Sequence, residues 1–420
     1  MKTVHRSRSI LLTLGLGLAA SSGLFAGTLT VRPGVPNNGG SARYSGTHGL
    51  EVDVATPDRN PAFVQSSHPS AEATYRVRFY VNLRGLTMTD GNEFDVFDAY
   101  DGADPVPPTV TGNPALRVVV RQVSGAFRLS AFVRQNNGGE LEIPAPPALA
   151  PGWRAIELNW AKSTAPGANN GRLDLWLDGV AQPSLTGVNN DTEVVNYARL
   201  GAVNGIDAGT SGTLKLDDFA SQRSGYIGLL SIFPDVPADF PFWSFIQGLY
   251  AAEITGGCGG GLFCPNSSVP RDQMSVFLVR AMHGPAFNPP PATGVFADVP
   301  PSYWAGNFIE QLAADGISGG CGGVPPNFCP TDLVTRAQMA IFLLRGKHGR
   351  NYQPPAATGT VFADVPANSF GAAWIEQLAA EGITGGCGGG NYCPGDPVSR
   401  GQMAVFMTRT FSLPVQQTGP

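Results

Sequence analysis

The segment GGCGGGNYCP, residues Gly385 to Pro394, occurs three times in this chain of 420 residues with only small changes. GGCGGGLFCP begins at Gly256, and GGCGGVPPNFCP begins at Gly319. All six cysteines of the sequence fall within these three segments. A unit repeated at nearly constant spacing is the mark of a repeat architecture, so the second half of the chain is predicted to consist of three copies of one structural unit.

The copies share more than the cysteine segments. FPDVP begins at Phe233, and FADVP begins at Phe296 and again at Phe362. In every copy the Asp of this motif is followed at fixed intervals by two isoleucines, the first cysteine and, seven residues after the second cysteine, an arginine. The only difference in length is two extra residues between the cysteines of the middle copy. Agreement over this many positions indicates true repeats.

Each copy is predicted to form a helix, a loop and a second helix. In FIEQLAADGI, the residues Ile309, Leu312 and Ile317 follow the spacing of one helical face, and Gly316 stands where a left-handed helix end is expected. The second helix opens with TRAQM or SRGQM in the later copies, and Ser or Thr followed three residues later by Gln is a capping box. The first copy has PRDQM instead, where a proline can serve the first turn.

The N-terminus predicts export. Basic residues at the start precede the apolar run ILLTLGLGLAA, and a small-residue cleavage site ends at Ala26, so residues 1–26 are predicted to be a signal peptide. The apolar run is too short to span a bilayer, and we expect a secreted protein with no membrane span. The 54 glycines, 36 prolines and 14% charged residues fit an extracellular protein. The net charge of −5, with no basic block outside the extreme N-terminus, argues against a nucleic-acid partner.

The cysteines are predicted to form disulfides within each copy, because an even number at a repeated spacing in an exported chain is typical of disulfides. The pairs are Cys258–Cys264, Cys321–Cys329 and Cys387–Cys393. Metal binding is the alternative, but each copy offers only two thiols, so we expect no metal site.

Taken together, F-x-D-V-P, an aromatic-rich helix, G-I, a glycine-rich loop and T-R-A-Q-M resemble the S-layer homology (SLH) domain. The resemblance covers about residues 231–413, in units predicted at 231–285, 294–349 and 360–413. It implies an all-α spindle of three units with pseudo-threefold symmetry. It also implies non-covalent anchoring to the cell surface or envelope through cell-wall polysaccharide.

The resemblance further implies which residues contact the glycan. The basic residue of the family's T-R-A-E motif falls on Arg271, Arg336 and Arg400, and a guanidinium can hold a glycan carboxylate through two parallel hydrogen bonds. The alternative is that these arginines are surface charges at helix starts. Glutamine replaces the motif's glutamate in all three copies, at Gln273, Gln338 and Gln402. Tryptophan stands at a different register position in each copy, so a sugar-stacking ring is not expected in every groove.

Residues 27–223 are predicted to form a second, all-β domain. Runs such as YRVRFYV, from Tyr75, and RLDLWLDG, from Arg172, alternate apolar and polar residues between turn signals. Period-two patterning at regular intervals favours an antiparallel, jelly-roll-like sandwich. The strand pattern and W-L-D-G resemble concanavalin-like and laminin-G-like domains, which implies a carbohydrate- or ligand-binding role. We expect Trp176 and Tyr80 to be cross-strand packing residues rather than sugar platforms.

One segment of the predicted sandwich carries three acidic residues whose spacing is close to that of a catalytic strand. NEFDVFD supplies Glu93, Asp95 and Asp98 and resembles the E-x-D-x-x-E strand of laminarinase-type glycoside hydrolases, but its last position is Asp. We expect no catalysis; the alternative is a secreted concanavalin-like glycoside hydrolase with an SLH anchor. Asp98, Asp101 and Asp104 form an oxygen-rich turn that could hold structural calcium, although a solvated turn is the expectation. No other cofactor is expected.

The cysteine pattern gives a first testable prediction. We expect all six cysteines to be oxidised, each with its partner in the same repeat. Peptide mapping under non-reducing conditions checks this directly. Free thiols, or links between peptides of different repeats, would contradict the prediction.

Overall fold

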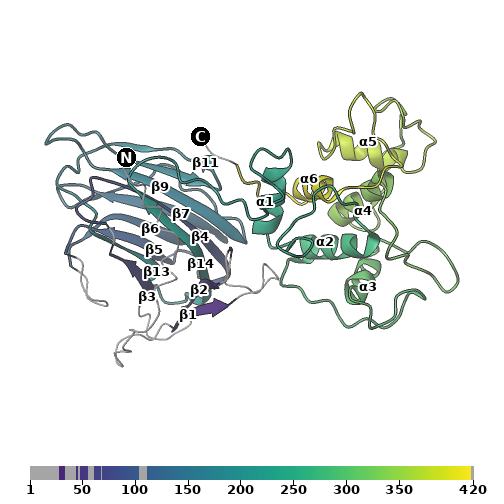
Figure 1. Cartoon of the computed structure of the whole chain (residues 1–420), viewed down its shortest axis with the longest axis horizontal. Coiled ribbons are helices and arrows are strands. Elements are labelled where there is room, and N and C mark those ends of the chain that lie inside the picture. The colour runs from purple at the N-terminus through teal and green to yellow at the C-terminus, as the bar shows by residue number, and fades with distance from the viewer. Residues whose placement is uncertain are drawn as a thin grey trace. The chain divides into compact units, whose positions relative to one another are not determined.

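The computed structural model describes residues 28–33, 44–45, 48–54, 61–67, 69–103 and 111–417, so the predicted signal peptide and Asp104 lie outside the described residues. The chain forms two compact units, one of strands and one of helices (Figure 1). The first runs to Leu230, beyond the end predicted at residue 223, and includes the chain from Gln416 onward. The second contains Ser231–Val415. Among the helices that the structure describes, none has the length and apolar character needed to cross a membrane.

The first unit contains two antiparallel sheets (Figure 1). The eight-stranded sheet has the order β1 (Thr28–Pro33), β2 (His48–Asp53), β14 (Ser211–Gln222), β4 (Thr74–Thr87), β9 (Trp153–Ala161), β10 (Gly171–Leu177) and β11 (Val180–Ala181), with β12 (Leu185–Val188) also paired to β10. The six-stranded sheet has the order β3 (Ala62–Ser66), β13 (Tyr197–Asn204), β5 (Glu93–Tyr100), β6 (Pro114–Val123), β7 (Ala126–Arg134) and β8 (Glu140–Glu142). The predicted antiparallel two-sheet region is confirmed.

The core of this unit lies between the two sheets. Val77, Phe79 and Val81 of β4 have no exposed surface, as their alternation with polar residues predicts. Phe79 stacks on Phe97 of β5 in the other sheet, with ring centroids 5.6 Å apart. The period-two pattern therefore identifies the inner face of β4 correctly.

Part of the polar face of the larger sheet is covered by other segments of the chain. Glu157 on β9 is only 2% exposed, and its carboxylate accepts hydrogen bonds from Arg76 Nε at 2.5 Å and from the backbone N–H groups of Ile227 and Gly228 at 2.8 and 2.9 Å. The chain beyond β14 is thus fastened to this face. Trp176 lies 4.4 Å from the Arg76 guanidinium, so it packs within this layer.

Tyr80 has a second role in the same layer. Its ring stacks on Tyr44 at 3.9 Å, and its hydroxyl accepts the N–H of Leu230 at 3.0 Å. The C-terminal end of the described chain also joins this unit, because Gln417 N–H donates to the carbonyl of Asp178 at 2.9 Å. The segment directly after β14 and the distant C-terminal segment therefore complete the sandwich.

The second unit contains six helices among its described residues: α1 (Trp243–Ala251), α2 (Arg271–His283), α3 (Gly306–Ala314), α4 (Arg336–His348), α5 (Ala372–Ala380) and α6 (Arg400–Thr410). Two helices fall in each predicted repeat. Both bonds of the predicted capping box are present at Thr335 and at Ser399. Pro270 is the N-cap of α2 and makes no side-chain cap.

The predicted helix ends are also present. Gly316 and Gly382 adopt φ angles of 75° and 71°, which give the left-handed turn that ends a helix. Glu253 takes the same conformation in the first repeat, with a φ of 66°, despite its side chain. The helix therefore ends in the same way in all three copies, because the backbone of the repeat requires it.

The buried Glu157 gives a prediction for the sandwich. Replacing it with Ala leaves the Arg76 guanidinium buried without its carboxylate and frees two backbone N–H groups, so the free energy of unfolding should fall by about 3–5 kcal/mol. Glu142→Ala is the control, because Glu142 pairs with Arg121 near the surface and should cost under about 1 kcal/mol. Chemical denaturation measures both. Equal losses in the two variants would contradict the assignment.

Candidate functional site

A ring of three backbone hydrogen bonds joins the repeats at their centre. Val269 N–H donates to Val398 O, Val398 N–H to Val334 O, and Val334 N–H to Val269 O, at 2.9–3.0 Å. All three valines are fully buried. Each precedes the motif arginine of its own repeat by two residues, so the ring brings the starts of α2, α4 and α6 together.

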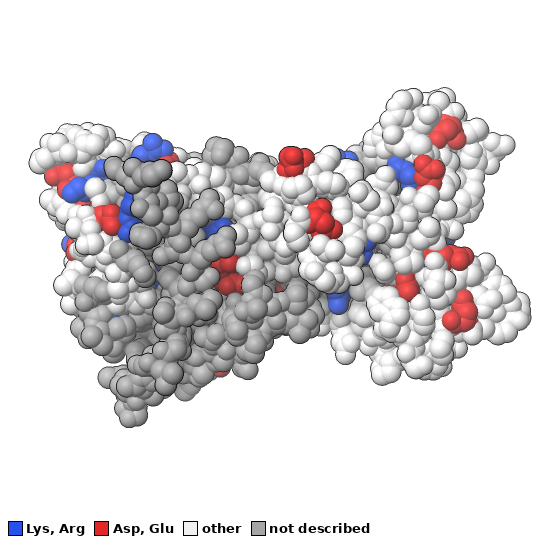
Figure 2. All heavy atoms as spheres, in the orientation of Figure 1, with Lys and Arg blue, Asp and Glu red and all other residues white. Residues whose placement is uncertain are grey.

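The motif arginines connect neighbouring repeats around this ring. The Nε of each donates to a backbone carbonyl in the next repeat, Arg271 to Phe328, Arg336 to Tyr392 and Arg400 to Phe263, at 2.8, 2.7 and 2.7 Å. Their exposed fractions are 4%, 3% and 4%, and on the face drawn in Figure 2 few blue atoms lie over the helical unit. The surface-charge alternative is therefore wrong. The three arginines lie at three separate junctions and are not brought into one site.

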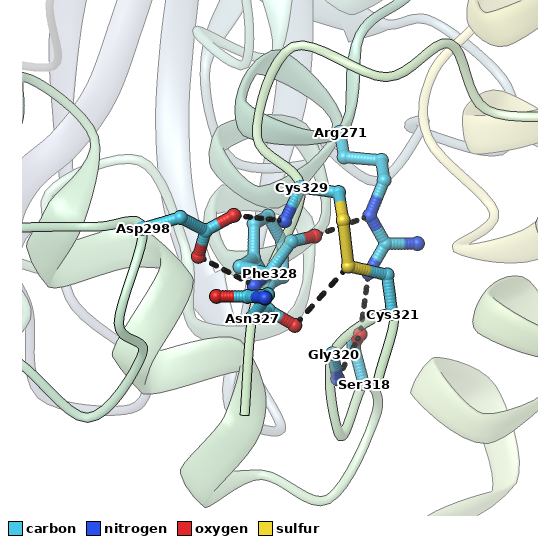
Figure 3. Close-up of a disulfide and its surroundings, with 8 residues drawn as sticks. All are labelled: Arg271, Asp298, Ser318, Gly320, Cys321, Asn327, Phe328 and Cys329. Carbon is cyan, nitrogen blue, oxygen red and sulfur yellow. Dashed lines mark hydrogen bonds between the residues drawn. A yellow bond between two sulfur atoms is a disulfide. The ribbon is translucent and has the colours of Figure 1, made fainter. Parts of the chain in front are cut away.

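The peptide that receives each arginine is held from the other side as well. Asp298, from the F-x-D-V-P motif, accepts the N–H groups of Phe328 and Cys329, both at 2.7 Å, while Arg271 binds the carbonyl of Phe328 (Figure 3). Asp235 and Asp364 make the same pair of bonds in their repeats. The motif aspartate and the motif arginine thus fix one peptide between two repeats.

The cysteine loops have the predicted disulfides, which pair Cys258 with Cys264, Cys321 with Cys329 and Cys387 with Cys393. The glycine before each first cysteine is required by the backbone. Gly320 has a φ of 101°, and a Cβ there would collide with the carbonyl of Asn327. Gly257 and Gly386 are in the same situation. The glycines therefore let the loop close under its disulfide (Figure 3).

A groove of about 280 Å³ lies where the arginine of the third repeat meets the cysteine loop of the first. It is lined by Ile254, Thr255, Gly256, Gly257, Cys258, Gln273, Val276, Phe277, Arg280, Trp304 and Arg400. This set contains two guanidinium groups and no carboxylate. Trp304 is 61% exposed, which leaves its ring accessible beside the charges. The groove therefore suits a small anionic group attached to a flat or ring-shaped ligand.

Arg400 places a buried positive charge at the groove. Its Nη1 donates to Gln273 Oε1 at 2.8 Å, and its buried Nη2 has no hydrogen-bond partner among the described residues. Burial lowers the pKa of Arg400 to about 10, and the charge of Asp235 offsets only part of this shift. A buried cation with an unused donor would gain from an anionic ligand.

The other two arginines differ in this respect. Arg336 also has a buried Nη2 without a partner in the described structure, whereas Arg271 Nη2 donates to Ser318 Oγ at 3.1 Å. Burial lowers the pKa of both arginines.

The sequence did not predict that Ser318 and Trp304 lie beside these arginines, or that Gln273 contacts Arg400. For Gln273 a signal was available, since Pro270 has no N–H for a capping box to use.

Each acidic residue on β5 accepts a hydrogen bond within the sheet, although Oδ1 of Asp98 is buried with no partner among the described residues. Glu93 accepts a bond from Arg121 at 2.5 Å, and Asp95 accepts one from Arg117 at 3.0 Å. Asp98 is fully buried and accepts the hydroxyl of Tyr100 at 2.8 Å. Burial raises the pKa of Asp95 to about 6, and burial together with the charge of Asp95 raises the pKa of Asp98 well above its usual range.

The proposed calcium turn is likewise occupied by protein contacts where it is described. Asp101 accepts the N–H of Asn113 at 2.6 Å and a bond from Arg134 at 3.3 Å. In the part of the chain that the structure describes, no three His, Cys, Asp or Glu residues are grouped so that they could hold a metal ion.

Comparison with known proteins finds a family for the second and third repeats. Residues 295–340 and 361–404 match the family model of the S-layer homology domain. These segments are S-layer homology repeats. The first copy lies outside the matched residues, but it shares the SLH spacing, the disulfide, the aspartate contacts and the arginine contacts described above.

One curated relative is a cell surface protein of Thermoanaerobacter kivui, 29% identical over 185 residues. The match covers 44% of this chain and 22% of that protein, so the chain spans about a fifth of its length.

Three solved structures resemble 42–49% of this chain. Cellulose induced protein Cip1 has a TM-score of 0.32 and 14% identity, with 90% of its own chain covered. Alginate lyase Aly36B has a TM-score of 0.29 and 13% identity, with 82% of its own chain covered. The receptor-binding domain of botulinum neurotoxin type G has a TM-score of 0.28 and 11% identity, with 40% of its own chain covered. At TM-scores this low, the likenesses say nothing about function.

The aspartate contacts give a prediction on pH. Burial raises the pKa of Asp364, but the hydrogen bonds from Tyr392 and Cys393 N–H and the charge of Arg336 together outweigh it, and the net shift lowers the pKa below its ordinary 3.8. A carboxyl whose pKa is lower in the folded state stabilises the fold above its unfolded pKa, and this stabilisation is lost as the pH falls through the folded pKa.

Asp364→Asn should therefore be less stable than the unmodified protein near neutral pH, and the difference should shrink in acid, from about pH 4 downward. Thermal unfolding of both proteins at a series of pH values measures the difference. A gap that stays constant into strong acid would contradict the assigned role of the carboxylate.

Proposed function

We propose that the three-repeat unit anchors an exported protein to the cell envelope by binding an acidic cell-wall polysaccharide in the grooves between repeats. The observation that carries the proposal is Arg400, a buried cation with an unpartnered Nη2, in a groove lined by two arginines and no carboxylate. The S-layer homology match and the cell surface protein of T. kivui support the same role.

The physical reason is the cost of burying a charge. Removing a guanidinium from water is unfavourable unless it is paired, and a hydrogen bond to a charged partner contributes about 1.5–3 kcal/mol. A glycan carboxylate at Arg400 would supply that partner. The exposed ring of Trp304 offers a flat apolar surface next to it, against which the body of a sugar could pack.

The proposal has finer parts. The three repeats form an all-α spindle, with Arg271, Arg336 and Arg400 each contributing to one groove. The N-terminal unit is a jelly-roll-like sandwich displayed at the cell surface after removal of residues 1–26, and it binds a carbohydrate or another ligand. We propose that it is not an enzyme, because Glu93, Asp95 and Asp98 each serve a contact within the sheet.

Sedimentation of the full-length protein with envelope fragments tests the anchoring. The protein should pellet with native fragments and should stay largely in solution with fragments whose carboxyl groups have been chemically reduced. Arg400→Lys should bind roughly tenfold more weakly, because the lysine keeps the charge but loses the planar donor array. Equal pelleting by native and carboxyl-reduced fragments would overturn the proposal.

The hydrolase alternative has its own readout. Release of reducing sugar from envelope polysaccharide by the full-length protein, abolished in Glu93→Gln, would show that the sandwich acts as an enzyme. Binding without release in both proteins is the expected result.

A further inference from the structure

We infer that the three grooves are unequal and that Gln273 and Trp304 make the groove at Arg400 the principal site for the acidic glycan. This inference rests on the proposed function. It arises from three differences between the copies, in the glutamine after the motif arginine, in the donors that each arginine leaves free, and in an exposed aromatic residue.

The glutamine has a different role in the first repeat. Gln338 and Gln402 each accept the N–H of the residue that caps their helix, Thr335 at 3.1 Å and Ser399 at 3.2 Å. In α2 the capping residue is Pro270, which has no N–H to offer. The oxygen of Gln273 is instead bonded to Arg400 Nη1 at 2.8 Å.

This contact orients Arg400 without neutralising it. A glutamate at position 273 would place a carboxylate at the same guanidinium and would compete with the carboxylate of a ligand. The uncharged amide fixes the direction of the side chain and leaves its charge available. The glutamine therefore favours an anionic ligand in this groove.

The arginines differ in the donors that they leave free. Arg400 and Arg336 each keep a buried Nη2 with no partner among the described residues. Arg271 uses its Nη2 on Ser318. An incoming carboxylate would have to displace that hydroxyl at Arg271, whereas at the other two junctions it would satisfy an unused donor.

An exposed aromatic residue distinguishes the junction of Arg400 from that of Arg336. Trp304 is 61% exposed and lines the Arg400 groove. Trp304 stands six residues after the motif aspartate of its repeat. The residue at the same position is Phe370 in the third repeat, which is 69% exposed, and Pro241 in the first repeat. By the same repeat relation, Phe370 belongs to the junction of Arg271 and Pro241 to that of Arg336.

The ring of Trp304 is also positioned by hydrogen bonds. Its Nε1 donates to Asp272 Oδ2 at 3.1 Å, and the neighbouring Tyr303 hydroxyl donates to the same atom at 2.8 Å. A free arginine donor, an orienting amide and a fixed aromatic platform thus occur together at Arg400. The other two junctions have a blocked donor or no platform.

Two pairs of variants of the full-length protein test this inference, with calorimetric titration of solubilised envelope polysaccharide as the measurement. Gln273→Glu should weaken binding by about tenfold or more, whereas Gln402→Glu should bind normally because glutamate serves a capping box equally well. Trp304→Ala should also lose about tenfold, and Phe370→Ala should lose less than about threefold. Thermal unfolding confirms that each variant is folded.

The results also distinguish this inference from the proposed function. If the unmodified protein fails to bind the polysaccharide, the anchoring proposal itself is wrong. If it binds and both members of either pair weaken binding to the same extent, the grooves are equivalent and the inference is overturned. Full binding by folded Gln273→Glu and Trp304→Ala would likewise overturn it.

Discussion

The helical unit depends on one interaction repeated three times, in which a buried arginine donates to a backbone carbonyl of the next repeat. Two short helices expose too much apolar surface to be stable alone, so the copies must pack together. Each arginine ties its helix start to the peptide that the neighbouring aspartate already holds. Because the last arginine returns to the first repeat, the bonds form a closed cycle, and all three junctions use the same contact.

The same interaction links stability to recognition. The arginine must be buried to reach the carbonyl, and burial leaves part of its guanidinium short of partners at two of the three junctions. The glycine-rich loop makes this arrangement possible, since its backbone turns sharply beneath a disulfide and the carbonyl of Phe328 faces the arginine of the neighbouring repeat. A ligand carboxylate would therefore complete a contact that folding has left partly unsatisfied.

The sandwich follows the same principle with different residues. Buried charges on the outer face of its larger sheet are satisfied by segments that come from outside the strands, notably Glu157 by the backbone of Ile227 and Gly228. The polar face of a sheet can therefore be internal without violating the alternation of the sequence. The acidic triplet of β5 also makes contacts within its own sheet, although its pattern partly resembles that of a catalytic strand.

The sequence determined the number of repeats, the disulfide pairs, the capping boxes and the two-sheet region, because each depends on local spacing and periodicity. It also identified Arg271, Arg336 and Arg400 as the basic residues of the motif. Only the tertiary structure decided that these arginines are buried and that Gln273 and Trp304, from different repeats, meet at Arg400. It likewise showed which chain segments cover the polar face of the larger sheet. The composition of the site depends on which repeats are neighbours in the folded protein. Near-identical repeats share one local sequence pattern, but packing gives each repeat a different neighbour.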